Sequence, residues 1–147
     1  MGHFKSSPGN QSTPALDYSA FDWNAPGAGR RSIYRIVWRG IADPFMEALD
    51  FPDLGLLSPV RSFSASPLQA LALFNNEFVL RQCEVFGARL EKLGPTTSDR
   101  IRAAFRLALE REPTAGELAD FTALVEKHGL AAAGRVIFNT NEFLFLN

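Results

Sequence analysis

The sequence has very little of the residues that build metal, haem and disulfide sites. Its 147 residues include one cysteine, Cys83, and two histidines, His3 and His128, which lie far apart. A single cysteine excludes a disulfide within the chain, and the isolated histidines match no zinc, haem or iron–sulfur spacing. We therefore expect neither a metal site nor a cofactor.

The sequence also lacks a large excess of positive or negative charge. Fifteen Lys and Arg against sixteen Asp and Glu leave a net charge of −1, so no broad positive field attracts nucleic acid or anionic lipid. The apolar runs fall short of the roughly 18 residues that a membrane-spanning helix needs, and the first residues lack the apolar stretch of a signal peptide. We expect no nucleic-acid partner and no membrane span, and the chain itself does not reveal its localisation.

Apolar residues, by contrast, are plentiful. They make up 46% of the sequence and include thirteen Phe, which is enough for a hydrophobic core and excludes disorder throughout the chain. The length is that of one ordinary domain. Because the start of the chain is rich in Ser, Gly, Pro and Asn, we expect a disordered tail over residues 1–14 and a single helical domain over residues 15–147.

Apolar residues recur at helical spacing through the second half of the chain. One such face predicts a helix from about Asn76 to Lys92, and its members are Val79, Cys83, Phe86, Leu90 and Leu93. Further helices are expected after Ser98, Thr114 and Gly129, and a short one follows Asp43. The predicted fold is mainly α, a bundle of about five helices with one extended or β segment packed against it.

Polar residues in the stretch "SASPLQALALFNNEF" permit two interpretations. Ser66, Pro67 and Gln69 form the pattern S-P-x-Q, which is typical of a capping box with proline at the first helical position. A catalytic serine would instead need a base within reach, and only His3 and His128 are imidazoles. We interpret Ser66 and Gln69 as structural caps and predict no catalytic residue.

A second capping box is predicted at Thr114 and Glu117, three residues apart. The apolar run Leu68–Phe74 behind the first box predicts a short helix that is buried on all sides. The pair Asn75 and Asn76 fits the end of that helix and a fresh cap for the next one.

The stretch "RRSIYRIVWR", from Arg30 to Arg39, carries four Arg and no acid. Its alternation favours a strand. The candidate ligand-binding residues are Arg30, Arg31, Tyr34, Trp38 and Arg61. They provide guanidinium groups for carboxylate or sulfate and aromatic faces for sugar rings. The alternative is structural: the aromatics belong to the core, the Arg side chains pair with nearby acids, and Arg61 tethers a loop.

Other notable residues have structural interpretations. Cys83 lies on an apolar stripe and is expected to be a small buried residue, and His128 stabilises a helix C-terminus. Glu142 is expected to cap or to pair with an Arg, and the apolar end Phe143–Leu146 is expected to dock. A solvated face is predicted for the acids of the last helices, which are Glu110, Glu112, Glu117, Asp120 and Glu126.

The order of several motifs resembles a known family. The motifs are "RRSIYRIVWRG", "ALDFPD", "VRSFSASPLQALALFNNEFV", "RIRAAFRLALEREPTAGEL" and "NTNEFLFLN". From about Asp17 to Asn147 they are similar to the C-terminal part of the planctomycete-specific domain of unknown function 1553. In this chain the aromatic of the family's F-D-x-P element is displaced to Phe51, and the family's upstream motifs do not occur. The chain is therefore expected to be a C-terminal fragment or a stand-alone remnant.

The resemblance implies a setting but no reaction. Members of the family often carry secretion signals, cytochrome c domains and carbohydrate-binding modules, which implies an exported or periplasmic protein that handles polysaccharide. Two functions stay open: a non-catalytic helical interaction module of the bacterial envelope, or part of a polysaccharide-binding or polysaccharide-degrading protein. Whether the chain is an enzyme is undecided, since it shows no catalytic constellation. Self-association, or docking to the absent upstream region or to another chain, is expected.

Overall fold

A computed structural model describes Asp22, residues 43–51 and residues 66–144 of the chain. The chain divides into two units, Met1–Ala65 and Ser66–Asn147. The described residues form helices, and no strand occurs among them. The mainly helical class is therefore confirmed, whereas the extended segment expected at Arg30–Arg39 lies outside the described residues.

The first unit contains one described helix, α1 (Pro44–Ala48). It begins where the sequence predicts, because Asp43 Oδ1 accepts hydrogen bonds from the backbone N–H groups of Phe45 and Met46 at 2.9 and 3.4 Å. Pro44 occupies the first turn, where its missing N–H has no intrahelical partner to lose. Asp50 follows in a left-handed conformation, with φ at 53°.

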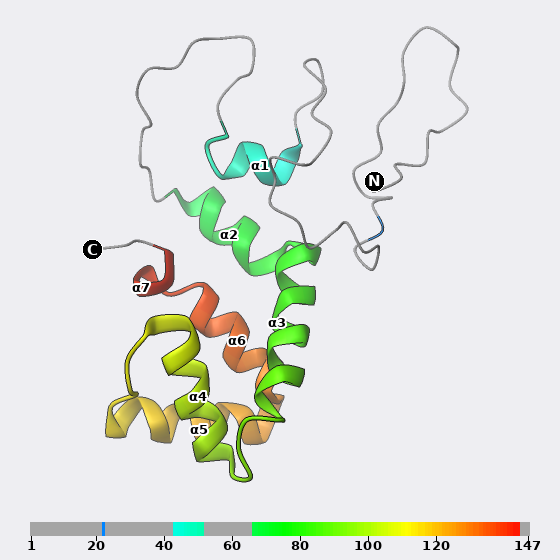
Figure 1. Cartoon of the computed structure of the whole chain (residues 1–147). Coiled ribbons are helices and arrows are strands. Elements are labelled where there is room, and N and C mark those ends of the chain that lie inside the picture. The colour runs from blue at the N-terminus through cyan, green and yellow to red at the C-terminus, as the bar shows by residue number, and fades with distance from the viewer. Residues whose placement is uncertain (1–21, 23–42, 52–65, 145–147) are drawn as a thin grey trace, which may run out of the picture. The chain divides into compact units, whose positions relative to one another are not determined.

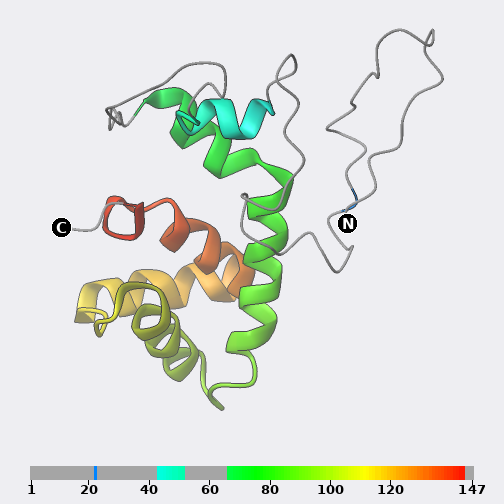
Figure 2. The ribbon, with the colours of Figure 1, turned by 45° about the horizontal axis from the view of Figure 1, so that its top comes forward.

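The second unit contains the remaining described helices, which Figure 1 shows in order along the chain. They are α2 (Pro67–Asn75), α3 (Glu77–Leu90), α4 (Thr97–Leu109), α5 (Ala115–His128), α6 (Leu130–Phe138) and α7 (Asn141–Leu144). Figure 2 shows α4, α5, α6 and α7 gathered on one side of α3. About five helices were expected, whereas the described residues form seven, and α7 was not predicted.

The core of the second unit forms where α3, α4 and α6 meet. Its buried members are Leu90, Ile101, Ala104, Phe105, Leu130 and Ile137. Residues of α5 complete the core from the side, and Phe121 meets Phe105 edge to face at 5.0 Å between ring centroids. The apolar residues that recur at helical spacing in α4, α5 and α6 are therefore the ones that pack.

Two glycines allow α3 and α6 to approach closely. A Cβ atom at Gly87 would lie 3.0 Å from the backbone nitrogen of Ala131, and one at Gly134 would lie 3.1 Å from the ring of Phe86. Cys83 lies in the same interface and is 2% exposed, so its prediction as a small buried residue is confirmed. The absence of side chains at these positions brings the two helix backbones together.

Three local predictions were wrong. Thr96, and not Ser98, caps α4. Thr96 Oγ1 accepts from the backbone N–H of Asp99, and Asp99 Oδ2 accepts from the backbone N–H of Thr96, a capping box that leaves Ser98 inside the helix. Helix α3 ends at Leu90, and Leu93 is exposed in the following turn. Helix α2, expected to be buried on all sides, has no buried residue.

Candidate functional site

The five candidate ligand-binding residues fall in the part of the chain that the structure does not describe. They are Arg30, Arg31, Tyr34, Trp38 and Arg61. Their role as a ligand-binding surface stays a prediction.

The polar residues of the α2 start are engaged with one another. Ser66 Oγ accepts a hydrogen bond from the backbone N–H of Gln69 at 3.2 Å, and Gln69 Oε1 accepts one from the backbone N–H of Ser66 at 3.4 Å. At the other end of α2, Asn76 Oδ1 accepts from the backbone N–H of Phe78 and so begins α3. These side chains hold helix ends in place, as capping residues do.

The same reciprocal bonds occur at the start of α5. Thr114 Oγ1 accepts from the backbone N–H of Glu117 at 3.3 Å, and Glu117 Oε2 accepts from the backbone N–H of Thr114 at 2.7 Å. The carboxylate of Glu117 also faces Arg111, which precedes the box in the chain. Glu117 therefore acts both as a cap and as the partner of a guanidinium.

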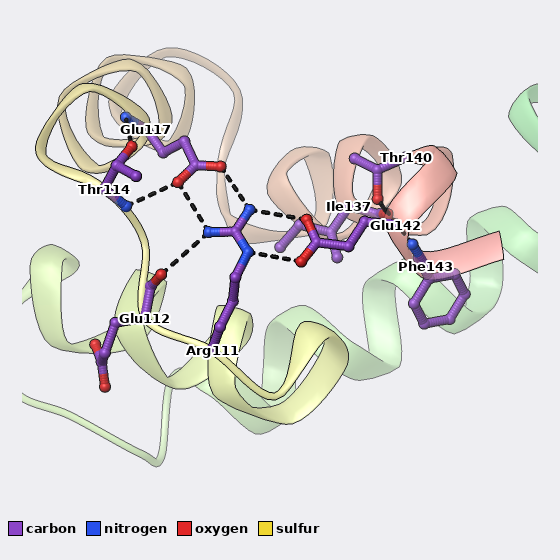
Figure 3. Close-up of polar contacts among 8 residues, drawn as sticks. All are labelled: Arg111, Glu112, Thr114, Glu117, Ile137, Thr140, Glu142 and Phe143. Atoms are coloured by element: carbon purple, nitrogen blue, oxygen red, sulfur yellow. Dashed lines mark hydrogen bonds and ion pairs between the residues drawn. The ribbon is translucent and has the colours of Figure 1, made fainter. Parts of the chain in front are cut away.

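Arg111 is the centre of the largest polar network among the described residues (Figure 3). Its Nη1 donates to Glu117 Oε2 at 3.0 Å and to the carbonyl oxygen of Glu112 at 3.1 Å. Its Nη2 donates to Glu117 Oε1 at 2.7 Å and to Glu142 Oε2 at 2.8 Å, and its Nε donates to Glu142 Oε1 at 2.6 Å. A guanidinium has five N–H groups, so each donor of Arg111 has an acceptor.

The backbone and the core position this guanidinium. Glu110 adopts a left-handed conformation, with φ at 57°, and ends α4. Arg111 is the next residue, and its Cζ lies 5.2 Å from the ring centroid of the core residue Phe105. The guanidinium therefore lies against an aromatic face. The network therefore joins the end of α4, the start of α5 and the helix α7.

Electrostatics keep both carboxylates ionised. Hydrogen bonds from Arg111, followed by the backbone N–H of Thr114, lower the pKa of Glu117 to about 2. Arg111 also lowers the pKa of Glu142, and the two carboxylates together raise the pKa of Arg111. A general acid or base works best with a pKa near the working pH, so these groups are suited to holding structure and not to proton transfer near neutrality.

A second arginine joins α6 to α2. Arg135 lies 3.8 Å from the ring centroid of Phe74. Its Nε donates to the carbonyl oxygen of Phe74 at 3.0 Å, and its Nη2 donates to Asn75 Oδ1 at 3.3 Å. One side chain thus contacts the ring, the backbone and the neighbouring amide at the C-terminal end of α2.

Aromatic rings continue from the α3–α6 interface to α7. The ring centroids of Phe86 and Phe138 are 5.1 Å apart, and those of Phe138 and Phe143 are 4.9 Å apart. Phe143 thus packs on Phe138, but it is 41% exposed and Leu144 is 37% exposed, so the docking expected for the apolar end Phe143–Leu146 is seen only in this one ring contact. The last three residues, 145–147, lie outside the described part.

Part of this site was predicted from the sequence. The expected pairing of Glu142 with an Arg is confirmed, but Glu117 belongs to a network and not only to a solvated face. Arg111 was missed altogether. Its position in the sequence could have indicated this role. Arg111 lies just before the capping box at Thr114, and the acid of that box, Glu117, has a second carboxylate oxygen that can accept from a guanidinium.

Two classes of site do not occur among the described residues. No group of three or more His, Cys, Asp or Glu side chains there is arranged to hold a metal ion. Likewise, none of the described helices has both the length and the apolar character that crossing a membrane requires.

Comparison with known proteins identifies a family. The model of the PSD1 family, proteins of unknown function (DUF1553), matches residues 4–125. The matched region contains the α2 motif, Arg111 and Glu117, whereas Glu142 and the closing "NTNEF" motif lie beyond it. No curated protein and no solved structure matches the chain. Because the match covers most of the sequence, the chain belongs to the PSD1 (DUF1553) family.

Proposed function

We propose that the protein is a non-catalytic helical interaction module that associates with a second copy of itself through α2. The exposed apolar face of α2 is the observation that carries this proposal. Leu68 and Leu71 are 62% and 59% exposed, and Phe74 is 44% exposed. Large exposed apolar patches mark interaction sites in soluble proteins.

The three residues lie on one face of the helix. Leu68, Leu71 and Phe74 follow one another at steps of three, so their side chains form a continuous stripe. Arg135 fixes the Phe74 end of this stripe through the ring and the backbone carbonyl. The face is therefore presented on a helix that is anchored at one end, which lowers the entropic cost of binding.

Charge favours a second copy as the partner. Helix α2 contains no charged residue, so two such faces meet without repulsion between like charges. A twofold dimer brings the same patch of each subunit together, and an apolar stripe is complementary to itself. The net charge of −1 adds little repulsion between whole chains.

The polar network supports a structural role for the rest of the unit. The donors of Arg111 are engaged by Glu112, Glu117 and Glu142 within the same chain. The guanidinium thus connects helices and has no donor left over for a substrate while α7 is in place.

Sedimentation velocity over a wide concentration range tests the proposal. The wild-type chain is expected to form dimers, and the double variant Leu68→Ser/Leu71→Ser is expected to dissociate with at least a tenfold higher dissociation constant. The matched control is Val85→Ser/Leu107→Ser, which removes two apolar side chains of similar exposure from α3 and α4. A wild-type chain that stays monomeric at several hundred micromolar, or a control that dissociates as readily, contradicts the proposal.

The polysaccharide alternative rests on residues outside the described part. Its support is compositional: Arg30, Arg31, Tyr34, Trp38 and Arg61 combine guanidinium groups with aromatic rings. Sulfated polysaccharide is then expected to quench tryptophan fluorescence, and Arg31→Ala and Trp38→Ala are expected to abolish the response. An unchanged spectrum in the wild-type chain contradicts this alternative.

A further inference from the structure

Helix α7 is held in place by side-chain contacts and by the backbone N–H groups of Phe143 and Leu144, which donate to Thr140, and not by burial. It has four residues, and none of them is buried. Glu142 reaches Arg111 through two hydrogen bonds, and the ring of Phe143 lies against that of Phe138. Two adjacent residues, an acid and an aromatic, therefore make the contacts that seat this helix.

The seat of α7 consists of the Arg111 guanidinium and the Phe138 ring, and other residues hold both in position. Glu117 binds Arg111 through two hydrogen bonds, and the carbonyl oxygen of Glu112 accepts a third. Phe86 lies against Phe138 at 5.1 Å between centroids. None of these supports belongs to α7, so Arg111 and Phe138 each keep a partner that does not depend on α7.

The seat offers a defined pair of donors. Arg111 directs Nε and one N–H of Nη2 toward Glu142, side by side. This is the planar fork that binds both oxygens of a carboxylate, and it is more specific in geometry than an ammonium group. Figure 3 shows the fork between Glu117 on one side and Glu142 on the other.

The anion in the seat is a carboxylate. Arg111 lowers the pKa of Glu142, and the negative charge of Glu117 opposes this lowering in part. Both oxygens of Glu142 accept from the fork, at 2.6 and 2.8 Å. The seat therefore suits the carboxylate of a ligand.

From these contacts we infer that the seat of α7 is a recognition site for a peptide of another chain that carries an acidic residue followed by an aromatic residue. In the isolated chain α7 occupies the site as an intramolecular ligand. The incoming carboxylate takes the place of Glu142 on Arg111, and the incoming ring takes the place of Phe143 on Phe138. This inference extends the proposed interaction role to a second surface, separate from α2.

Competition sets the expected strength of binding. Helix α7 is attached to α6 through Asn139 and Thr140 alone, so its effective concentration at the seat is high. A free peptide binds only to the fraction of chains in which α7 has left, and its apparent affinity falls by that fraction. Removing the anchors of α7 should therefore strengthen binding in trans.

The experiment uses a labelled peptide with the sequence of residues 139–147 and measures fluorescence anisotropy with the full chain. Binding to the variant Glu142→Gln/Phe143→Ala is expected to be at least tenfold tighter than binding to the wild-type chain. Adding Arg111→Met to that variant should abolish binding. A peptide with Gln in place of its Glu is the control and should bind at least tenfold more weakly.

The inference is overturned if the peptide binds the wild-type chain and the Glu142→Gln/Phe143→Ala variant (the vacated variant) with equal affinity. It is also overturned if adding Arg111→Met does not weaken binding, or if the neutral peptide, which has Gln in place of Glu, binds as well as the original peptide. If circular dichroism shows that the vacated variant is unfolded, hydrogen exchange in the wild-type chain decides instead. Excess peptide should then accelerate exchange of the Phe143 amide, and the neutral peptide should not; unchanged exchange refutes the inference. The Leu68→Ser/Leu71→Ser chain should bind the peptide as the wild type does, which separates this inference from dimerisation through α2.

Discussion

Arg111 donates from Nε and Nη2 to the two carboxylate oxygens of Glu142, at 2.6 and 2.8 Å, across 31 residues of chain. The same guanidinium donates to both oxygens of Glu117. The side chains of Arg111, Glu117 and Glu142 are 35%, 32% and 44% exposed. Water therefore weakens the attraction within each ion pair. The network therefore contributes geometric specificity more than stability, and it fixes where α5 and α7 begin relative to α4.

The stability of the second unit should fall as the pH drops from about 4.5 to about 2. Arg111 holds the pKa of Glu117 at about 2, below its ordinary value of 4.5, and lowers the pKa of Glu142 as well. A carboxylate with a lowered pKa in the folded state stabilises the fold above its unfolded pKa, and this stabilisation is lost as the pH falls through the folded pKa. Urea unfolding between pH 7 and pH 2 measures the change.

Arg111→Met should flatten this pH dependence, because neither carboxylate then has the guanidinium that lowers its pKa. At neutral pH the loss should be modest, about 1 kcal/mol, since the side chains are partly exposed. Arg81→Met is the matched control, because it removes an exposed ion pair with Glu84 inside α3. A steep acid transition that persists in Arg111→Met would show that other groups control it.

Gly87→Ala should destabilise the second unit by about 1–3 kcal/mol. The new Cβ would lie 3.0 Å from the backbone nitrogen of Ala131, so α3 and α6 must move apart. Gly116→Ala is the matched control. It lies within α5 with no atom within 4 Å of its new Cβ, and it should stabilise by about 0.5–1 kcal/mol through the reduced freedom of the unfolded chain. Thermal and urea unfolding compare the two, and equal effects would contradict the close packing of α3 on α6.

Thr114→Ala should lower the free energy of unfolding by about 1 kcal/mol, the usual cost of losing an N-cap hydroxyl. Thr114 Oγ1 accepts from the backbone N–H of Glu117, and Thr114→Ser keeps that acceptor and should be nearly neutral. Because hydrogen bonds from Thr114 also help to lower the pKa of Glu117, the alanine variant should show a slightly higher Glu117 pKa by NMR titration. A serine variant as unstable as the alanine variant would point to the methyl group and not to the cap.

The sequence predicted local features well, because capping and helical periodicity depend on residues a few positions apart. The boxes at Ser66 and Thr114 and the stripe through Cys83 are of this kind. The sequence predicted that Glu142 could pair with an Arg, but it did not identify Arg111. The two residues lie far apart along the chain, so no local pattern connects them. The close approach at Gly87 depends on a second helix, α6.

The error on α2 has a different cause. An apolar run predicts burial only when another element covers it, and a pattern does not state whether one does. Leu68 and Leu71 have the composition of core residues and are nevertheless exposed. Ser98 illustrates competition between caps: Thr96 has an acid, Asp99, at the third helical position, and this reciprocal bond moves the start of α4 two residues earlier.

Arg135→Gln should loosen α2 while leaving the α3–α6 core intact. The guanidinium lies on the ring of Phe74 and donates to its carbonyl oxygen, and none of the residues of α2 is buried. An exposed cation–π contact is worth about 0.5–1 kcal/mol, so amide exchange in α2 should become about two- to fivefold faster. Arg135→Lys, which keeps the charge and loses the planar fork, should give an intermediate rate. Hydrogen exchange followed by mass spectrometry measures both, with peptides from α4 as the internal reference. If amide exchange becomes equally faster in α2 and α4, Arg135 supports the whole unit. It is then not a specific anchor of α2, the helix through which we propose that the chain dimerises.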